Sequence, residues 1–156
     1  MKRVGLAAVA VALLLGTPAV SAAKPPSFAI WWSHFTARVQ RDVVRVTHTC
    51  QRSYGTNDAK IGACFVKRER ISLRQERRAW ETQLERIARS QKAGCRKAIG
   101  RFRAATRTSA AANLRYLDTH RHSALSKISR DLNGEPFAGL KTRTFAAKAH
   151  AVRICG

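Results

Sequence analysis

The stretch DAKIGACFVKRERISLRQERRAWETQLERIARSQKAGCRKAIGRF, residues 58–102, decides the fold class of this chain. Its apolar residues recur at spacings of three, four, seven or eight positions, the period of a helix with one apolar face. They are Val66, Leu73, Trp80, Leu84, Ile87, Cys95, Ile99 and Phe102. Lys, Arg and Glu fill most positions between them, and Gly94 and Gly100 weaken a helix without ending it. We therefore expect a long helix that begins near Asp58, with the chain reversing only near residues 106–109.

Apolar residues with the same helical spacing flank this stretch on both sides. They predict further helices over residues 28–51, 114–132 and 140–154. Ser27 is a typical N-cap for the first of these, and Asn133-Gly134 is a typical stop for the second. No strand-like alternation of four or more residues occurs in the sequence. The prediction is an all-α bundle of about four helices, one of them long, in a single domain over residues 23–156.

The first 22 residues have the order of a secretory signal peptide. Lys2-Arg3 precede an apolar run over residues 4–15, and small residues then favour cleavage after Ala22, with a cut after Ala23 nearly as good. The run is too short to span a bilayer. We therefore expect an exported mature chain, periplasmic or secreted, with no transmembrane segment. Loss of Lys2 and Arg3 leaves 28 basic and 9 acidic residues, a formal charge of +19.

The mature chain holds four cysteines, Cys50, Cys64, Cys95 and Cys155. An even number in an exported chain indicates two disulfides, for which three pairings are possible. Cys50 and Cys64 flank the first expected turn. Because a helix rises about 1.5 Å per residue, a reversal near 106–109 lets the last helix climb back to the level of Cys95. The layout therefore favours the pairs Cys50–Cys64 and Cys95–Cys155.

The basic surplus is the feature with the greatest bearing on function. Arginine is always charged, and its planar donor fork matches carboxylates and phosphates. A charge of this size favours an anionic polymer, an envelope surface or an acidic protein as the partner. The candidate binding residues on the long helix are Arg70, Arg74, Arg77 and Arg78. The alternative is a solvated surface that serves only solubility. No nucleic-acid-binding motif accompanies the charge, so specific nucleic acid recognition is not expected.

An aromatic cluster at residues 28–35 offers a second candidate surface. Adjacent Trp31 and Trp32 lie about 100° apart on a helix, which disfavours a central core position for both. An exposed Trp31 followed by arginines is typical of a helix that docks on a membrane interface or a protein partner. The alternative is a wide apolar face that the other helices cover. Trp31 is therefore a candidate binding residue.

One stretch combines Cys50, a polar helix start at 56–58, Cys64 and the tryptophan-bearing segment 77–80. This order resembles that of the small exported lysozyme-inhibitor family. Residues 87–91 are similar to a short segment of periplasmic helical chaperones. These local resemblances imply a periplasmic protein-binding inhibitor or chaperone-like protein as the alternative function. The Cys50–Cys64 spacing is longer than in the inhibitors, and a cationic chain is a poor electrostatic partner for a cationic lysozyme.

The sequence holds no pattern that predicts catalysis, a metal site or a cofactor. His120 and His122 are two positions apart, so they point to different sides of a helix. Each of the 9 carboxylates lies near a basic residue or at an expected helix end. Nucleophile elbows and phosphate-binding loops are absent. The sequence therefore predicts an exported, non-catalytic helical binding protein without cofactor or metal.

Overall fold

A computed structural model of the chain describes residues 26–155, which form five α-helices and no strand. The helices are α1 (Phe28–Tyr54), α2 (Asp58–Arg89), α3 (Ala93–Thr119), α4 (Leu125–Asn133) and α5 (Glu135–Cys155). The all-α class is confirmed. The expected number of helices is corrected, because α1, α2 and α3 are all long, with 27, 32 and 27 residues, and two shorter helices follow. The predicted signal peptide and its cleavage site lie outside the described residues.

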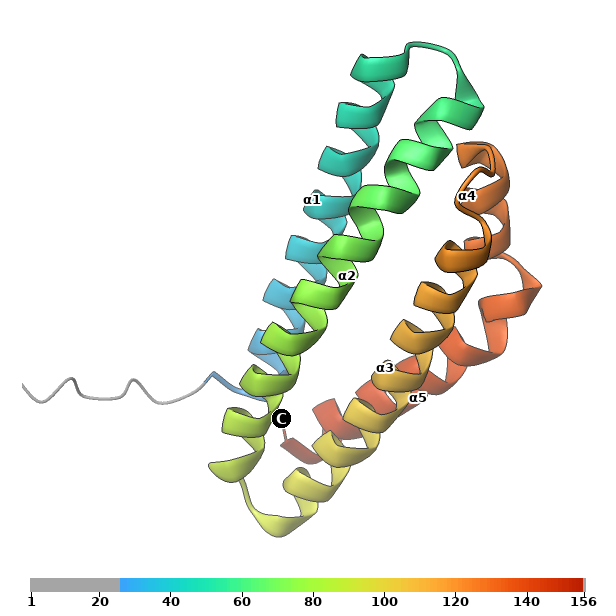
Figure 1. Cartoon of the computed structure of the whole chain (residues 1–156). Coiled ribbons are helices and arrows are strands. Elements are labelled where there is room, and N and C mark those ends of the chain that lie inside the picture. Colours follow the sequence, from blue (N-terminus) through green and yellow to red (C-terminus); the bar gives the residue numbers. More distant parts are fainter. Residues whose placement is uncertain (1–25, 156) are drawn as a thin grey trace, which may run out of the picture.

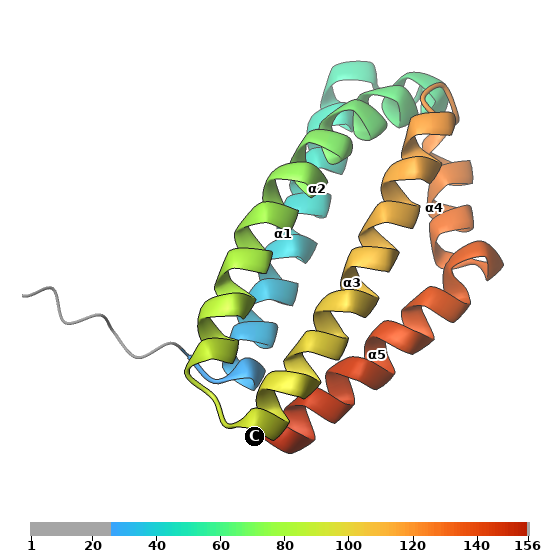
Figure 2. The same cartoon turned by 60° about the horizontal axis from the view of Figure 1, so that its bottom comes forward.

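The first three helices run alternately up and down an elongated bundle, and α4 and α5 both run back in the direction opposite to α3 (Figure 1). The first two, α1 and α2, form an antiparallel hairpin, and α3 packs against α2. The return path beside α3 is shared by α4 and α5, so two helices in sequence make the fourth column of the bundle (Figure 2). The start of α1, the turn between α2 and α3, and the end of α5 all lie at one end of the molecule (Figure 1).

Local side chains define where the first two helices begin and end. Ser27 caps α1 as expected, because its Oγ accepts a hydrogen bond from the Ile30 N–H at 3.4 Å. Gly55 ends α1 in the left-handed region, with φ 59°, where glycine carries no steric penalty. Asn57 then caps α2 by accepting from the Lys60 N–H at 3.0 Å.

The reversal after α2 lies at residues 90–92, so the prediction of a reversal near 106–109 is wrong. Ser90 ends α2, and its hydroxyl donates to the Ile87 carbonyl oxygen at 2.8 Å. Residues 104–112 remain helical because alanine is a strong helix former. The Thr106 hydroxyl within this segment donates to the Phe102 carbonyl oxygen at 3.0 Å, so its hydrogen bond is made inside the helix.

The predicted pairing of the cysteines is nevertheless confirmed. The structure joins Cys50 to Cys64 and Cys95 to Cys155, with Cα–Cα distances of 5.7 and 5.0 Å. The second pair meets because α3 ends at Thr119 instead of continuing to residue 132. The rise along α3 is about 40 Å, and the combined rise of α4 and α5 is about 45 Å. The end of α5 therefore reaches the start of α3.

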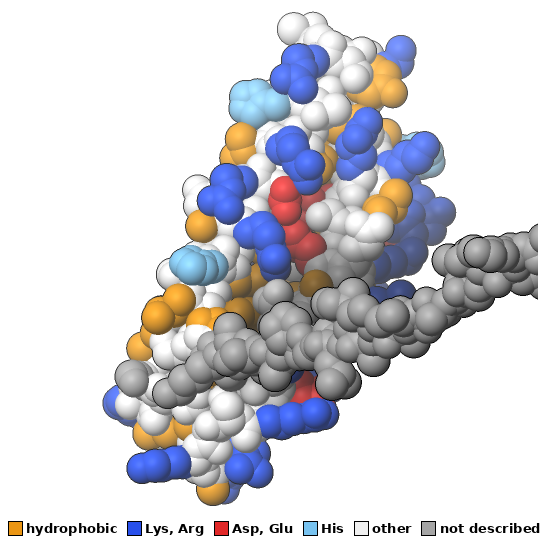
Figure 3. Space-filling model, turned by 90° about the vertical axis from the view of Figure 1, so that its left-hand side faces the viewer, with side chains coloured by type: hydrophobic (Ala, Val, Ile, Leu, Met, Phe, Trp, Pro, Cys, Tyr) orange, Lys and Arg blue, Asp and Glu red, His pale blue; other side chains and the backbone are white. Residues whose placement is uncertain are grey.

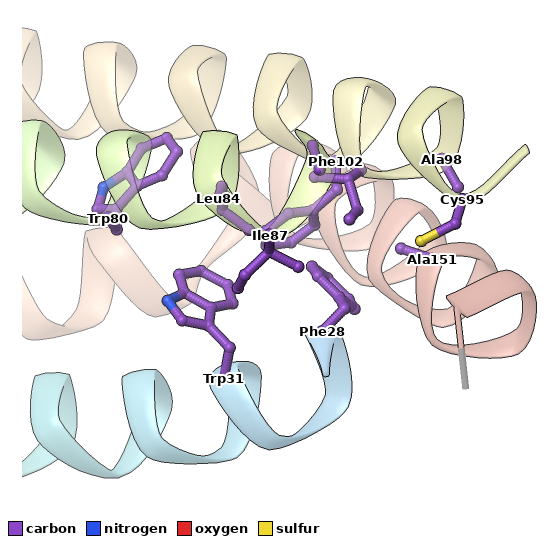
Figure 4. Packing of buried hydrophobic residues seen from close by; sticks show 11 residues of the cluster. Phe28, Trp31, Trp80, Leu84, Ile87, Cys95, Ala98, Phe102 and Ala151 are labelled. Carbon is purple, nitrogen blue, oxygen red and sulfur yellow. The ribbon is translucent and has the colours of Figure 1, made fainter. Parts of the chain in front are cut away.

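Buried side chains form two clusters, one at each end of the bundle. The first holds Phe28, Trp31, Trp80, Leu84, Ile87, Cys95, Phe102 and Ala151, and Figure 4 shows the aromatic rings from α1 and α3 closing over Ile87. The second holds Val46, Cys50, Ile61, Phe65, Val66, Leu117 and Ile128. Each cluster contains one disulfide, so at each end of the core a covalent bond joins two helices. Within the described residues, no helix is long and apolar enough to cross a membrane.

Candidate functional site

Arg70 does not belong to the open cationic surface. Its guanidinium forms an ion pair with Asp118 on α3, and its side chain is 21% exposed. The Nε of Arg70 is buried and has no hydrogen-bond partner. Arg70 therefore links α2 to α3. The sequence predicted that it lies on the open surface instead.

The other three predicted arginines lie on the exposed side of α2. Arg74 and Arg78 have no carboxylate within 4.0 Å among the described residues. Arg77 lies 3.6 Å from Glu81, which Arg107 of α3 also contacts through two bonds of 2.8 and 3.0 Å. The hydrogen bond from Arg107 lowers the pKa of the Glu81 carboxyl below its usual value. Arg74 and Arg78 are thus the free cations of the predicted set.

Trp31 is buried, with 5% of its surface exposed. Its ring stacks on Phe35 with centroids 5.0 Å apart, and it projects from α1 toward Ile87 (Figure 4). The indole N–H donates to the Gln83 side-chain oxygen at 2.8 Å. The apolar face of α1 is therefore covered by the other helices at this position, and an exposed Trp31 is not observed. Its partly buried neighbour Trp32 packs against the same core cluster.

A pocket of about 690 Å³ lies between α1 and α2, beside Trp31. Trp31, Phe35 and Ile87 provide apolar lining, and Arg38, Arg41, Arg86, His34 and Gln83 provide the polar part. We call it the arginine pocket. Helical spacing explains the arrangement. Each of residues 31, 34, 35, 38 and 41 of α1 is three or four positions from another of them, so they lie on one face of the helix.

The three arginines of this pocket are not neutralised by direct ion pairs. Within residues 26–155, no carboxylate lies within 4.0 Å of the Arg38, Arg41 or Arg86 guanidinium groups. The Nε of Arg38 is buried without a hydrogen-bond partner, and its guanidinium carbon lies 5.9 Å from the Phe35 ring centroid. Unpaired guanidinium groups over an apolar floor can bind an anion that carries an apolar body.

Elsewhere the basic side chains are spread out. Figure 3 views the side of the molecule that carries α1, and Lys and Arg are distributed along it instead of forming one patch. A small group of acidic side chains is visible among them. The arginine pocket therefore combines cations with a defined cavity, whereas the rest of this face offers dispersed charge.

Sequence reasoning missed a group of carboxylates at the contact of α1 and α2. Burial, together with the smaller effects of the Glu76 and Asp42 charges, raises the pKa of Glu69 to about 7. Burial, followed by a hydrogen bond with Asp42, raises the pKa of Glu76. A signal was present, because Glu69 lies three residues after Val66 and four before Leu73, on the apolar face of the helix.

In the described part of the chain, no group of three or more His, Cys, Asp and Glu side chains is arranged to hold a metal ion. The chain matches no protein-family model, no curated protein and no solved structure.

Proposed function

We propose that this protein is an exported, non-catalytic binding protein that holds an anionic partner on its arginine-rich surface, with the arginine pocket as the principal contact. The partner is an anionic polymer, an envelope component or an acidic protein. The observation that carries the proposal is the trio Arg38, Arg41 and Arg86, which lines a cavity without a carboxylate in contact. Two disulfides are typical of an exported chain in an oxidising compartment.

The charge of the whole molecule supports the proposal in a second way. A net charge of this sign attracts anions at long range and raises the rate of encounter, while the pocket selects among them at short range. The alternative, a protein-binding inhibitor or chaperone that docks through Trp31, loses its main support because the Trp31 ring is buried.

The test compares two triple variants with the same net charge. Arg38→Gln/Arg41→Gln/Arg86→Gln empties the arginine pocket of cations, and Arg68→Gln/Arg74→Gln/Arg78→Gln removes three exposed cations of α2. Binding of the oxidised protein to lipopolysaccharide, a heparin-like polymer and DNA is titrated with salt. At about 0.15 M ionic strength, we expect the native protein to prefer one member of this panel, and only the pocket variant to lose that preference. On DNA, its salt slope should fall by about 2 to 3.

Each alternative result has a defined meaning. Equal losses in both variants would show that attraction is generic and that the pocket has no special role. A loss confined to the α2 variant would move the site to the surface formed by Arg68, Arg74 and Arg78. An absence of binding near 0.15 M salt to every member of the panel would overturn the proposal of an anionic polymer or lipopolysaccharide partner.

A further inference from the structure

A second cavity follows the opposite side of α1. Its larger part, about 620 Å³, lies between α1 and α4, and its smaller part, about 320 Å³, lies between α1 and α5. Val39 lines both parts, so they adjoin, and we call them together the α1–α4/α5 groove. Both volumes fall within the ~300–1,000 Å³ typical of small-molecule sites.

The walls of the groove are mainly apolar. Val39 and Val43 of α1 face Leu125 and Leu132 of α4, and Phe65 and Leu117 line it from α2 and α3. Trp32 and Phe145 extend the apolar lining into the smaller part. Phe145 is 58% exposed, so its ring is accessible at the smaller part of the groove.

The larger part of the groove differs in charge from the rest of the molecule. Among the residues that line it there is no Lys or Arg, although the whole chain has 30 of them. Two carboxylates line it, those of Asp58 and Glu69. The Asp58 carboxylate already accepts bonds from the backbone N–H and the hydroxyl of Ser126. The second carboxylate is therefore the one available to a ligand.

Glu69 has the properties of a ligand-binding group. It is 8% exposed, and no hydrogen bond or ion pair to its side chain occurs within residues 26–155. Asp42 and Glu76 lie near enough to raise its pKa through their charges. The Glu69 carboxyl group is largely removed from water, and an approaching cation would supply a donor and relieve the repulsion from its acidic neighbours.

We propose that the α1–α4/α5 groove binds a small, elongated apolar ligand that carries one protonated amine, with the ammonium group on the Glu69 carboxylate. The apolar body would lie along Val39, Val43 and Leu132, and the amine would donate to the unpartnered oxygen atoms of Glu69. The charge of this ligand is opposite to that of the partner on the arginine pocket. The inference is therefore independent of the proposed function.

The experiment uses three probes that share one alkyl chain and differ only in the head group, which is a primary amine, an alcohol or a carboxylate. Calorimetric titration of the oxidised protein is done at a pH above 7, so that Glu69 is ionised. An alkyl amine of the lysine type stays protonated until about pH 10.4. The amine should bind about tenfold or more tightly than the alcohol, and Glu69→Gln should abolish this difference.

Two matched variants complete the design. Glu135→Gln removes one exposed carboxylate that is not among the residues that line the groove, and it should leave the preference for the amine unchanged. Ser129→Trp places a bulky ring on an exposed position of the groove wall and should weaken the amine and the alcohol alike. Ser129 is exposed, so this variant leaves the core intact.

Several results would overturn the inference. They are equal binding of amine and alcohol, tightest binding of the carboxylate, amine binding that survives Glu69→Gln, and no binding of any probe. The polyanion titration described above is repeated with the Glu69→Gln protein. Because this substitution leaves Arg38, Arg41 and Arg86 in place, failure of the groove and failure of the anion site are read separately.

Discussion

Gly62 is the residue at which α2 comes closest to the chain between α3 and α4. A Cβ atom at this position would overlap the Ser123 carbonyl oxygen and would lie 2.7 Å from the Leu125 nitrogen. Both are backbone atoms, so the contact is not relieved by a side-chain rotation. We predict that Gly62→Ala lowers the free energy of unfolding by about 1–3 kcal/mol, measured by denaturant titration.

Gly100 provides the matched control in the interior of α3. Nothing lies within 4 Å of a Cβ atom built there, so Gly100→Ala should raise the free energy of unfolding by about 0.5–1 kcal/mol through the higher helix propensity of alanine. If Gly62→Ala left the stability unchanged or raised it as Gly100→Ala should, the close approach at Gly62 would not be a constraint on the fold.

Glu69 makes the stability depend on pH. Its pKa is raised by burial from 4.5 to about 7, so between these values the folded chain holds a proton that the unfolded chain has released. The free energy of unfolding should therefore fall as the pH rises from about 4.5 to about 7, by about 3 kcal/mol, and change no further above it.

Glu69→Gln should remove this fall, which thermal unfolding at a series of pH values would measure. The variant should be more stable than the native chain above pH 7 and about as stable below pH 4.5. An unchanged pH profile in the variant would show that another group titrates. Glu135→Gln, at an exposed position, should keep the native profile.

At the scale of single elements, the sequence predicted correctly that these segments are helical, but it predicted the ends of the helices less well. Ser27 and the turn after α1 were recognised because their chemistry is local. The end of α2 was missed because Ser90 and Gln91 carry only a weak stop signal, whereas Gly94 and Gly100, the more visible residues, lie inside α3. The turn at 120–124 was missed because the apolar stripe resumes beyond it.

Asp58 links two elements that are far apart in the sequence. It lies in the first turn of α2, and its carboxylate accepts from the Ser126 N–H at 3.3 Å and the Ser126 hydroxyl at 2.5 Å in the first turn of α4. We predict that Asp58→Ala loosens α4 by about 1 kcal/mol, because the Ser126 N–H and hydroxyl in the first turn of that helix lose their acceptor.

Hydrogen exchange of the α4 amides, residues 125–133, measures this effect. Asp58→Asn keeps an acceptor but removes the charge, so its effect on exchange should be smaller. Faster exchange spread evenly over all five helices would instead mean that Asp58 supports the whole bundle.

At the scale of the whole molecule, the net charge could be read from composition, but the site could not. The sequence places arginines all around α2, and it does not show which of them a carboxylate neutralises. Asp118 reaches Arg70 from α3, and Arg107 competes with Arg77 for Glu81. The arginine pocket depends on α1 and α2 lying side by side. The spacing of apolar residues in the sequence does not show which faces of two helices meet.

The Cys95–Cys155 bridge holds the last helix to the bundle. It closes a separation of 60 residues, against 14 for Cys50–Cys64. We predict that Cys95→Ser/Cys155→Ser lowers the free energy of unfolding by about 2–5 kcal/mol, about 1 kcal/mol more than Cys50→Ser/Cys64→Ser. Denaturant titration of both variants measures the difference. Hydrogen exchange should rise most in α5, and a rise confined to α1 and α2 would contradict the prediction.

The two bridges also differ in when they can form. A chain synthesised from its N-terminus delivers α1 and α2 first, so Cys50 and Cys64 can react with each other while the partner of Cys95 does not yet exist. Once they have done so, neither is available to Cys95, and only Cys155 remains when α5 emerges. The order of synthesis therefore selects one pairing of the three, and early oxidation of the first hairpin protects the later half of the molecule from mispairing.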